Sequence, residues 1–231
     1  MNTNKFFPLL FSCLISIVIS AKSNAFYQKD QIISDNVLSI PHTNQIIKVD
    51  GKLDDEIWLS ALKVSLNYET APNENIIPDV KTTVYLAEDG ENLYVAFKSQ
   101  DPEPDKIRAF YRDRDKVSND DFVSIILDTY NDSTRAYQFY VNALGVQKDS
   151  VLNDDGENDS WDAIWESASE IHSRGYIVEM VIPLQILSFS DVKQQTWGIN
   201  LLRIRPRDKR QQIQLSPDDR NNDCSLCQLT K

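Results

Sequence analysis

Hydrophobic and polar residues alternate with a period of two along most of the chain from residue 80 onward. The alternating segments are 80–86, 93–97, 123–127, 137–141, 176–182 and 197–201. Such alternation is typical of strands that bury one face. Turn-forming sequences separate the segments, for example Glu-Asp-Gly-Glu-Asn at 88–92. Several short strands in succession predict an all-β fold, an antiparallel β-sandwich of the immunoglobulin or jelly-roll type.

A helical pattern occurs only near the start of this region. Leu53, Ile57 and Ala61 recur every four residues, and acidic residues occupy 54–56. Acidic side chains in a first turn complement the helix dipole, so we expect one short amphipathic helix over residues 53–62. Trp58 and Trp197 occupy core-facing positions of their elements and are expected to pack inside.

The N-terminal residues resemble a targeting signal. Residues 1–25 combine Lys5, an apolar run and small residues before a cleavage position, which is typical of a secretory signal peptide. The run is shorter than the roughly 20 apolar residues of a membrane-spanning helix. Lipidation at Cys13 is the weaker alternative, because Phe11 is bulky for a lipidation box. We expect an exported protein that is periplasmic, associated with the outer membrane, or secreted.

The remaining chain has the length of one domain. We expect an N-terminal arm at 26–45 and the sandwich at 46–206. Beyond Pro206 the alternation decays, so residues 207–231 are expected to form a linker or tail that leads to a further C-terminal domain. Cys224 and Cys227 lie in this tail; export favours a disulfide between them, since a zinc site would lack its second pair of ligands.

The net charge of the chain excludes some classes of binding partner. The formal net charge is −11 and the isoelectric point about 4.6. An acidic surface of this kind repels nucleic acid and anionic lipid, so no nucleic acid is expected as a partner. Neutral sugars and metal cations remain compatible. Acidic residues crowd at 149–162, where a structural calcium ion is an alternative to a solvated loop, although the spacing does not fit an EF-hand.

Catalytic motifs are not recognisable in the sequence. His42 and His172 stand outside any nucleophile–base pattern, and phosphate-binding glycine loops are missing. Paired carboxylates could still hydrolyse a glycosidic bond, because their separation is invisible in a sequence. A binding protein is therefore favoured over an enzyme, and a free-standing glycosidase is the least favoured class.

Two tryptophans are candidates for ligand binding. Trp161 and Trp165 are four residues apart and lie beside acids and amides. Flat aromatic rings stack on the apolar faces of sugars, so the pair could form a sugar platform. The alternative is that one or both seal an edge of the sandwich.

Five segments in order resemble family-nine carbohydrate-binding modules. They are 49–61 (Val-Asp-Gly-Lys-Leu-Asp-Asp-Glu-Ile-Trp-Leu-Ser-Ala), 92–97 with Asp101 following, 120–128 (Asp-Asp-Phe-Val-Ser-Ile-Ile-Leu-Asp), 137–142 (Tyr-Gln-Phe-Tyr-Val-Asn) and 175–183 (Gly-Tyr-Ile-Val-Glu-Met-Val-Ile-Pro). The resemblance implies a β-sandwich and non-catalytic binding of an oligo- or polysaccharide, in support of carbohydrate breakdown by a linked or partner glycoside hydrolase.

The resemblance does not extend to the usual sugar contacts. Where sugar-binding members carry Trp, Glu and Arg, this chain has Ser118, Ser124 and Tyr140. Strand alternation points Ser124 and Tyr140 away from the core. The candidate ligand-binding residues are Trp161, Trp165, Tyr140 and Asn142.

Other segments, including 128–132 and 141–145, resemble a second group that uses the same domain. In that group the domain precedes an outer-membrane β-barrel. The alternative function is therefore a periplasmic interaction or plug domain with a vestigial sugar site.

Overall fold

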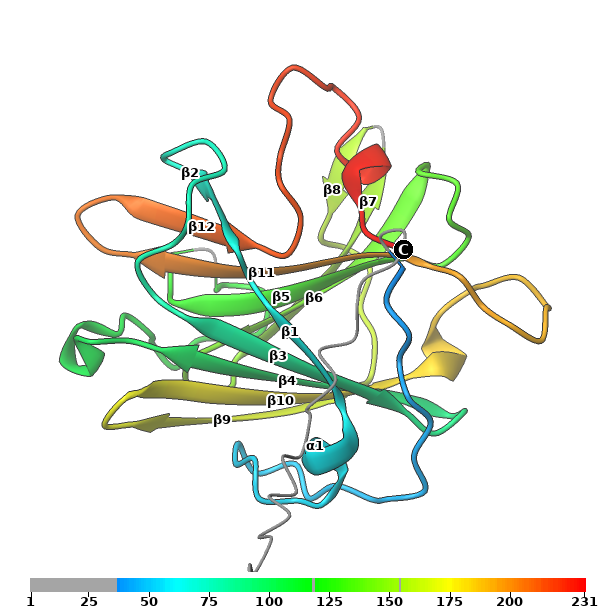
Figure 1. Ribbon diagram of the computed structural model, residues 1–231, viewed down its shortest axis with the longest axis horizontal. Coiled ribbons are helices and arrows are strands. Elements are labelled where there is room, and N and C mark those ends of the chain that lie inside the picture. The colour runs from blue at the N-terminus through cyan, green and yellow to red at the C-terminus, as the bar shows by residue number, and fades with distance from the viewer. Residues whose placement is uncertain (1–36, 118, 154) are drawn as a thin grey trace, which may run out of the picture. The chain divides into compact units, whose positions relative to one another are not determined.

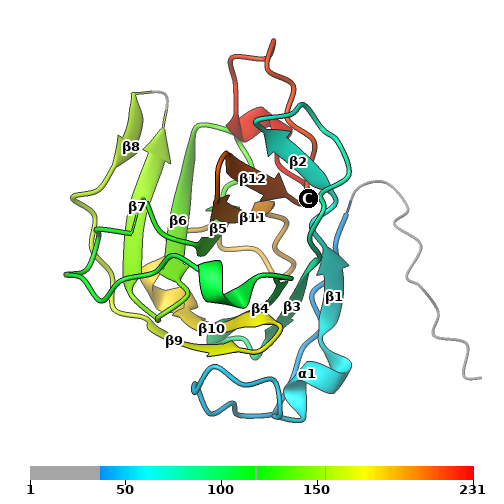
Figure 2. The same ribbon diagram turned by 90° about the vertical axis from the view of Figure 1, so that its left-hand side faces the viewer.

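The computed structural model describes residues 37–231 apart from 118 and 154. The expected signal peptide, most of the expected N-terminal arm and Ser118 lie outside the described residues. Two antiparallel sheets pack face to face as a sandwich (Figures 1 and 2). The predicted all-β fold with one short helix is therefore confirmed. Within the described residues, no helix is long and apolar enough to cross a membrane.

Each sheet is built from antiparallel neighbours. The five-stranded sheet has the spatial order β1 (Leu62–Ser65), β3 (Thr82–Glu88), β4 (Asn92–Gln100), β10 (Gly175–Pro183) and β9 (Glu166–His172). The seven-stranded sheet has the order β2 (Tyr68–Ala71), β12 (Arg210–Gln214), β11 (Gly198–Pro206), β5 (Phe122–Asp128), β6 (Arg135–Asn142), β7 (Gln147–Asn153) and β8 (Gly156–Asn158). Short 3-10 helices η1 (Pro104–Lys106), η2 (Leu184–Ile186) and η3 (Leu226–Gln228) lie in the connections.

The main core fills the space between the sheets. It takes alternate residues of the central strands, such as Val95 and Phe97 from β4 and Ile125 and Phe139 from β5 and β6. These residues are the hydrophobic members of the period-two pattern. The opposite residues of the seven-stranded sheet form a separate outer face with its own buried cluster.

The helix is shorter than its sequence pattern suggests. Only α1 (Ile57–Ser60) is helical, and β1 begins at Leu62. The prediction of a helix over 53–62 is therefore wrong in extent. Ile57 and Trp58 are buried against the outer face of the five-stranded sheet together with Tyr94 and Ala96, so packing holds a single turn in place.

Glu179 connects two of the five segments that resemble the family. Its carboxylate lies on the outer face of β10 and accepts hydrogen bonds from Asp50 N (3.0 Å), Gly51 N (2.8 Å) and Trp58 Nε1 (2.9 Å). Burial raises the pKa of Glu179 above its ordinary value, although these donors oppose the shift. The segment 49–61 is thereby fastened to the segment 175–183.

The backbone at Gly51 requires a glycine at this contact. Its φ is +82°, and a Cβ there would lie 2.7 Å from the backbone carbon of Ser169. A side chain would be strained by its φ and would collide with β9. The Asp-Gly turn can therefore approach the sheet closely enough for Glu179 to accept its two N–H groups.

The tail beyond Pro206 is part of the sandwich, so the prediction of an unpaired tail is wrong there. β12 pairs with both β11 and β2. Thr230 forms a bridge with Ile199, and the buried side chains of Leu226 and Leu229 pack on Ala136. Cys224 and Cys227 form a disulfide, as expected. The composition misled the prediction because four of the five residues of β12 are polar, although only Arg210 is fully exposed and Ile213 and Gln214 are buried.

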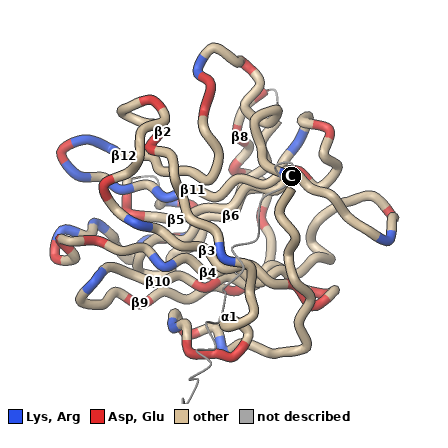
Figure 3. Tube along the Cα trace, viewed as in Figure 1, with Lys and Arg blue, Asp and Glu red and all other residues tan. Residues whose placement is uncertain are grey.

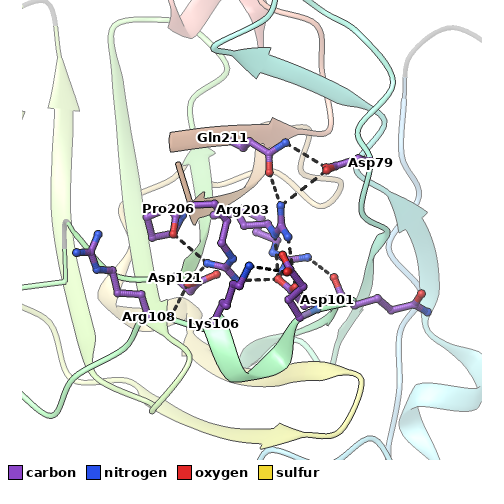
Figure 4. Close-up of polar contacts among 12 residues, drawn as sticks. Asp79, Asp101, Lys106, Arg108, Asp121, Arg203, Pro206 and Gln211 are labelled. Carbon is purple, nitrogen blue, oxygen red and sulfur yellow. Dashed lines mark hydrogen bonds and ion pairs between the residues drawn. The ribbon is translucent and has the colours of Figure 1, made fainter. Parts of the chain in front are cut away.

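A buried ion cluster closes one end of the sandwich, where charges of both signs lie close together (Figure 3). Asp101 follows β4 and has a side chain with 0% exposure. Its Oδ2 accepts from Arg203 (3.1 Å), Arg205 (2.9 Å) and Arg207 (2.8 Å), which all come from β11 or the turn after it (Figure 4). Arg207 also pairs with Asp121 at 2.8 Å. The cluster therefore links the two sheets.

Candidate functional site

A pocket of about 300 Å³ opens on the outer face of the seven-stranded sheet. Six strands (β5, β6, β7, β8, β11 and β12) and the segment before β5 contribute to it. The lining residues are Val117, Phe122, Gln138, Tyr140, Lys148, Glu157, Leu202, Ile204, Arg210 and Gln212. This volume is at the lower end of the range for small-ligand sites.

The register of the strands brings these side chains together. Ser124 lies opposite both Tyr140 and Leu202, and Tyr140 lies opposite Lys148. Because alternate residues share a face, these residues all point away from the core. The sheet is curved, with β2 and β8 at its two sides (Figure 2). The prediction that Ser124 and Tyr140 face away from the core is confirmed.

The floor of the pocket is apolar. Phe122, Tyr140, Leu202 and Ile204 form a buried cluster with Val117. The rings of Phe122 and Tyr140 meet edge to face with centroids 5.6 Å apart. A floor of this kind fits the apolar face of a ring-shaped ligand.

One wall is a polar network centred on Glu157. Its carboxylate accepts hydrogen bonds from the hydroxyl of Tyr140 and from Ser150 Oγ (2.8 Å), and it pairs with Lys148 Nζ at 3.0 Å. Lys148 also pairs with Asp159 at 3.1 Å, and its ammonium lies 5.0 Å from the centre of the Tyr140 ring. The network fixes the position of every polar group on this wall.

The ionisation of this wall favours binding over proton transfer. Burial and the hydrogen bond to Glu157 raise the pKa of Tyr140, which stays a neutral phenol. Burial alone would raise the pKa of Glu157, but hydrogen bonds from Tyr140, Lys148 and Ser150 lower it below its ordinary value. A general acid or base works best with a pKa near neutrality, and both shifts lead away from it.

The predicted site residues are not brought together. Tyr140 lines the pocket, and Ser124 lies beneath it, fully buried, where its Oγ accepts a hydrogen bond from Gln138 (2.9 Å). Asn142 is fully buried, and its side chain forms hydrogen bonds with the backbone of neighbouring loops. Its amide nitrogen donates to Phe110 O and Asp120 Oδ2, and its oxygen accepts from Leu144 N and Val146 N. All four of its hydrogen-bonding positions are used, so Asn142 shapes the loops beside the pocket and does not face a ligand.

Trp161 and Trp165 close an edge of the sandwich. Trp165 is 5% exposed and packs edge-on against the core residue Phe139, with centroids 5.2 Å apart. Trp161 is half-buried against Tyr137 (4.9 Å) and Phe139 (5.8 Å). The side chains of Tyr137 and Phe139 belong to the core. The edge-sealing alternative therefore describes both tryptophans better than an open platform does.

Of the ten lining residues, only Tyr140 was a predicted site residue, and several polar ones were missed. Lys148 and Glu157 lie in the acidic region around 149–162, and Arg210 and Gln212 lie in the supposed tail. One signal in the sequence could have indicated β12. Ile213 is apolar and buried, so Arg210, Gln212 and Gln214, at even-numbered positions, belong to the opposite face of a strand.

A second hollow of about 500 Å³ lies at the edge where β7 and β9 meet. It is wider and more open than the pocket, and Arg112, Arg114 and Gln147 line it. Arg114 is already engaged by Asp149, Gln147 and the carbonyl of Ala163. We therefore place the candidate site in the pocket on the seven-stranded sheet.

A calcium ion at 149–162 was an alternative to a solvated loop. Among the described residues, no three His, Cys, Asp or Glu side chains are grouped so that they could hold a metal ion. Asp154, one of the acids at 149–162, lies outside the described residues.

Comparison with known proteins agrees with this architecture. The model of the family described as carbohydrate family 9 binding domain-like matches residues 49–221. No curated protein sequence matches the chain. Two solved structures of a family 9 carbohydrate-binding module from Caldicellulosiruptor kristjanssonii, one in complex with cellotriose and one with glucose, are similar to it. Each has a TM-score of 0.62 and 17% identity, and they cover 83% of this chain and 89% and 92% of their own. At 17% identity, this structural similarity shows a shared fold alone.

Proposed function

The chain belongs to the carbohydrate family 9 binding domain-like family, and on that premise we propose that its outer-face pocket binds a carbohydrate. The observation that carries the proposal is the pairing of an apolar floor with a fixed polar wall. The floor of Phe122, Tyr140 and Leu202 suits the C–H face of a pyranose ring. The charged and amide groups around it suit hydroxyl groups.

The position of the pocket supports the same proposal. The family's Glu and Arg contacts are expected at Ser124 and Tyr140, and these two residues lie opposite each other on this face. Tyr140, at the position of the family's Arg, donates a hydrogen bond to Glu157, so β8 supplies an acid to this face of the sheet. The pocket therefore keeps the location of a sugar site while its side chains differ.

The proposal is tested by binding to soluble oligosaccharides. We expect the chain to bind members of a panel that includes cellotriose, and Tyr140→Ala to weaken that binding at least about tenfold, since it removes one ring of the floor and one support of Glu157. Isothermal titration calorimetry measures both. Tyr130→Ala is the matched control, because Tyr130 is a tyrosine exposed beyond the far end of β5.

Two results would contradict the proposal. A blank panel with a folded protein would remove carbohydrate binding. Unchanged affinity in Tyr140→Ala, with the thermal unfolding of the variant showing a folded sandwich, would move the site elsewhere. Gln212→Ala, from the other side of the pocket, provides a second variant with a smaller effect on the core.

We propose further that binding is non-catalytic, takes place after export, and supports breakdown of carbohydrate by a linked or partner glycoside hydrolase. The ionisation of Tyr140 and Glu157 supports the absence of acid–base catalysis in the pocket. The purified chain is expected to release no product from aryl glycosides, and cell fractionation is expected to find it outside the cytoplasm. Turnover of an aryl glycoside would contradict the first point.

A further inference from the structure

Two neighbouring aromatic side chains are exposed in the segment between η1 and β5. Tyr111 is 82% exposed and Phe110 is 51% exposed. Single exposed hydrophobic residues are common and need no explanation. Two adjacent aromatic rings that point into solvent from one segment are a larger feature, and rings of this kind often serve binding.

The backbone that carries this pair is held by buried polar side chains. Phe110 N donates to Asp120 Oδ2 (3.3 Å), and Phe110 O accepts from Asn142 Nδ2 (3.1 Å). Two residues earlier, Arg108 N donates to Asp121 Oδ2 at 2.7 Å, and Arg108 O accepts from Asp121 N at 2.6 Å. Asp120, Asp121 and Asn142 are fully buried. The fold therefore fastens this backbone, which lowers the entropy cost of using the rings in binding.

The rings themselves are partly oriented. The guanidinium of Arg112 lies 4.9 Å from the centre of the Phe110 ring, within cation–π range. Tyr111, next to Phe110, keeps most of its surface open. Consecutive residues thus offer two exposed rings, one of them oriented by a cation, and a sugar can stack on such a ring.

This segment borders the proposed carbohydrate pocket. Asn142, which holds Phe110, is the last residue of β6, and it lies opposite Phe122, the first residue of β5. Phe122 lines the pocket, and so does Val117 from the same segment as the aromatic pair. Asp115 N also donates to Gln147 O at the start of β7. Figure 2 shows this end of the sandwich facing the viewer.

We propose that Phe110 and Tyr111 form a second sugar subsite, which stacks a residue of an oligosaccharide whose neighbouring sugar occupies the pocket. This inference rests on the proposed function. The resemblance places a tryptophan at position 118 of the same segment, where this chain has Ser118. Phe110 and Tyr111 provide aromatic side chains at other positions of that segment.

The test compares ligand lengths. Cello-, manno- and xylo-oligosaccharides of two to five sugars are titrated into the wild-type chain, into Phe110→Ala, into Tyr111→Ala and into the double variant. Where the wild type gains affinity with length, the double variant is expected to lose about tenfold for the longer ligands, in line with one stacking contact, and to bind the shortest ligand unchanged. Tyr130→Ala, which removes an exposed ring beyond the opposite end of β5, is expected to behave as wild type.

The outcomes separate the two proposals. If the wild type binds oligosaccharides with no gain in affinity with length, or if the double variant retains the full gain, the second subsite is overturned and the pocket stands. If the double variant loses the shortest ligand equally, the rings do not form a separate subsite. If no series binds to the folded wild type, the second subsite falls together with the proposed function.

Discussion

Asp101→Asn is expected to lower the free energy of unfolding by about 3–5 kcal/mol, the usual cost of removing one partner from a buried ion pair. The substitution keeps the shape of the side chain and removes its charge. Arg203 and Arg205, which are buried, then lose the carboxylate that neutralises them. Domains of this size are stable by roughly 5–15 kcal/mol, so the loss is a large share of the total. Urea denaturation followed by tryptophan fluorescence measures it.

Asp79→Asn is the matched control for this variant. Asp79 contacts Arg205 at 3.8 Å, but its side chain is mostly exposed. An exposed pair contributes about 0–1 kcal/mol, so the control should unfold almost as the wild type does. Equal losses in the two variants would contradict the assignment of Asp101 as the central counterion.

The pH dependence provides an independent check on Asp101. Burial alone would raise its pKa, but the hydrogen bonds and charges of Arg205 and Arg207 lower it below the usual range. The unfolded carboxyl therefore takes up its proton at a higher pH than the folded one. Its contribution to stability is present above the ordinary pKa of about 3.9 and is lost as the pH falls through the folded pKa. The difference in stability between wild type and Asp101→Asn should shrink below about pH 4.

Glu179→Ala is expected to cost about 3 kcal/mol and to loosen the segment 49–61. The substitution leaves Gly51 N and Trp58 Nε1 without their acceptor in a buried place. Each buried donor left unsatisfied costs roughly 1–3 kcal/mol. Denaturant unfolding gives the total, and hydrogen exchange should show faster exchange of the Gly51 amide than in the wild type.

Glu170→Ala, an exposed acid of the neighbouring strand β9, provides the comparison. It should change the stability by less than about 0.5 kcal/mol, as is usual for surface positions. If Glu179→Ala were as mild as Glu170→Ala, the segment 49–61 would be held by apolar packing alone.

The sandwich was predictable because its signal is local. Val123, Ile125 and Leu127 alternate with polar or outer-face residues, and the same holds along β6 and β10, so each strand shows its buried face in its own sequence. The disulfide between Cys224 and Cys227 was predictable from spacing and from the expected export. The outward direction of Ser124 and Tyr140 followed from the same alternation.

The elements that failed depend on distant partners. β12 is a strand because it pairs with β11 on one side and with β2 on the other. The sequence of 210–214 carries no information about either partner. The pattern of Leu53, Ile57 and Ala61 predicted a helix over 53–62. The observed helix α1 ends at Ser60, and strand β1 begins at Leu62. In both places tertiary packing overrides local propensity.

The site was harder to predict because its residues come from separate strands. Trp161 and Trp165 were favoured for their chemistry, but their rings pack against Phe139. Asn142 was predicted to bind ligand, but its amide is used by backbone groups and by the side chain of Asp120. Lys148 and Glu157 become pocket residues only through the pairing of β6, β7 and β8.

The most direct test of carbohydrate binding in the pocket is a heteronuclear NMR titration of the wild-type chain with cellotriose and with the other oligosaccharides of the panel. The predicted result is saturable shifts centred on Gln138, Tyr140, Lys148 and Gln212, with smaller shifts at Tyr111. Shifts centred on the edge formed by Trp161 and Trp165, or an unchanged spectrum with every sugar, would contradict it.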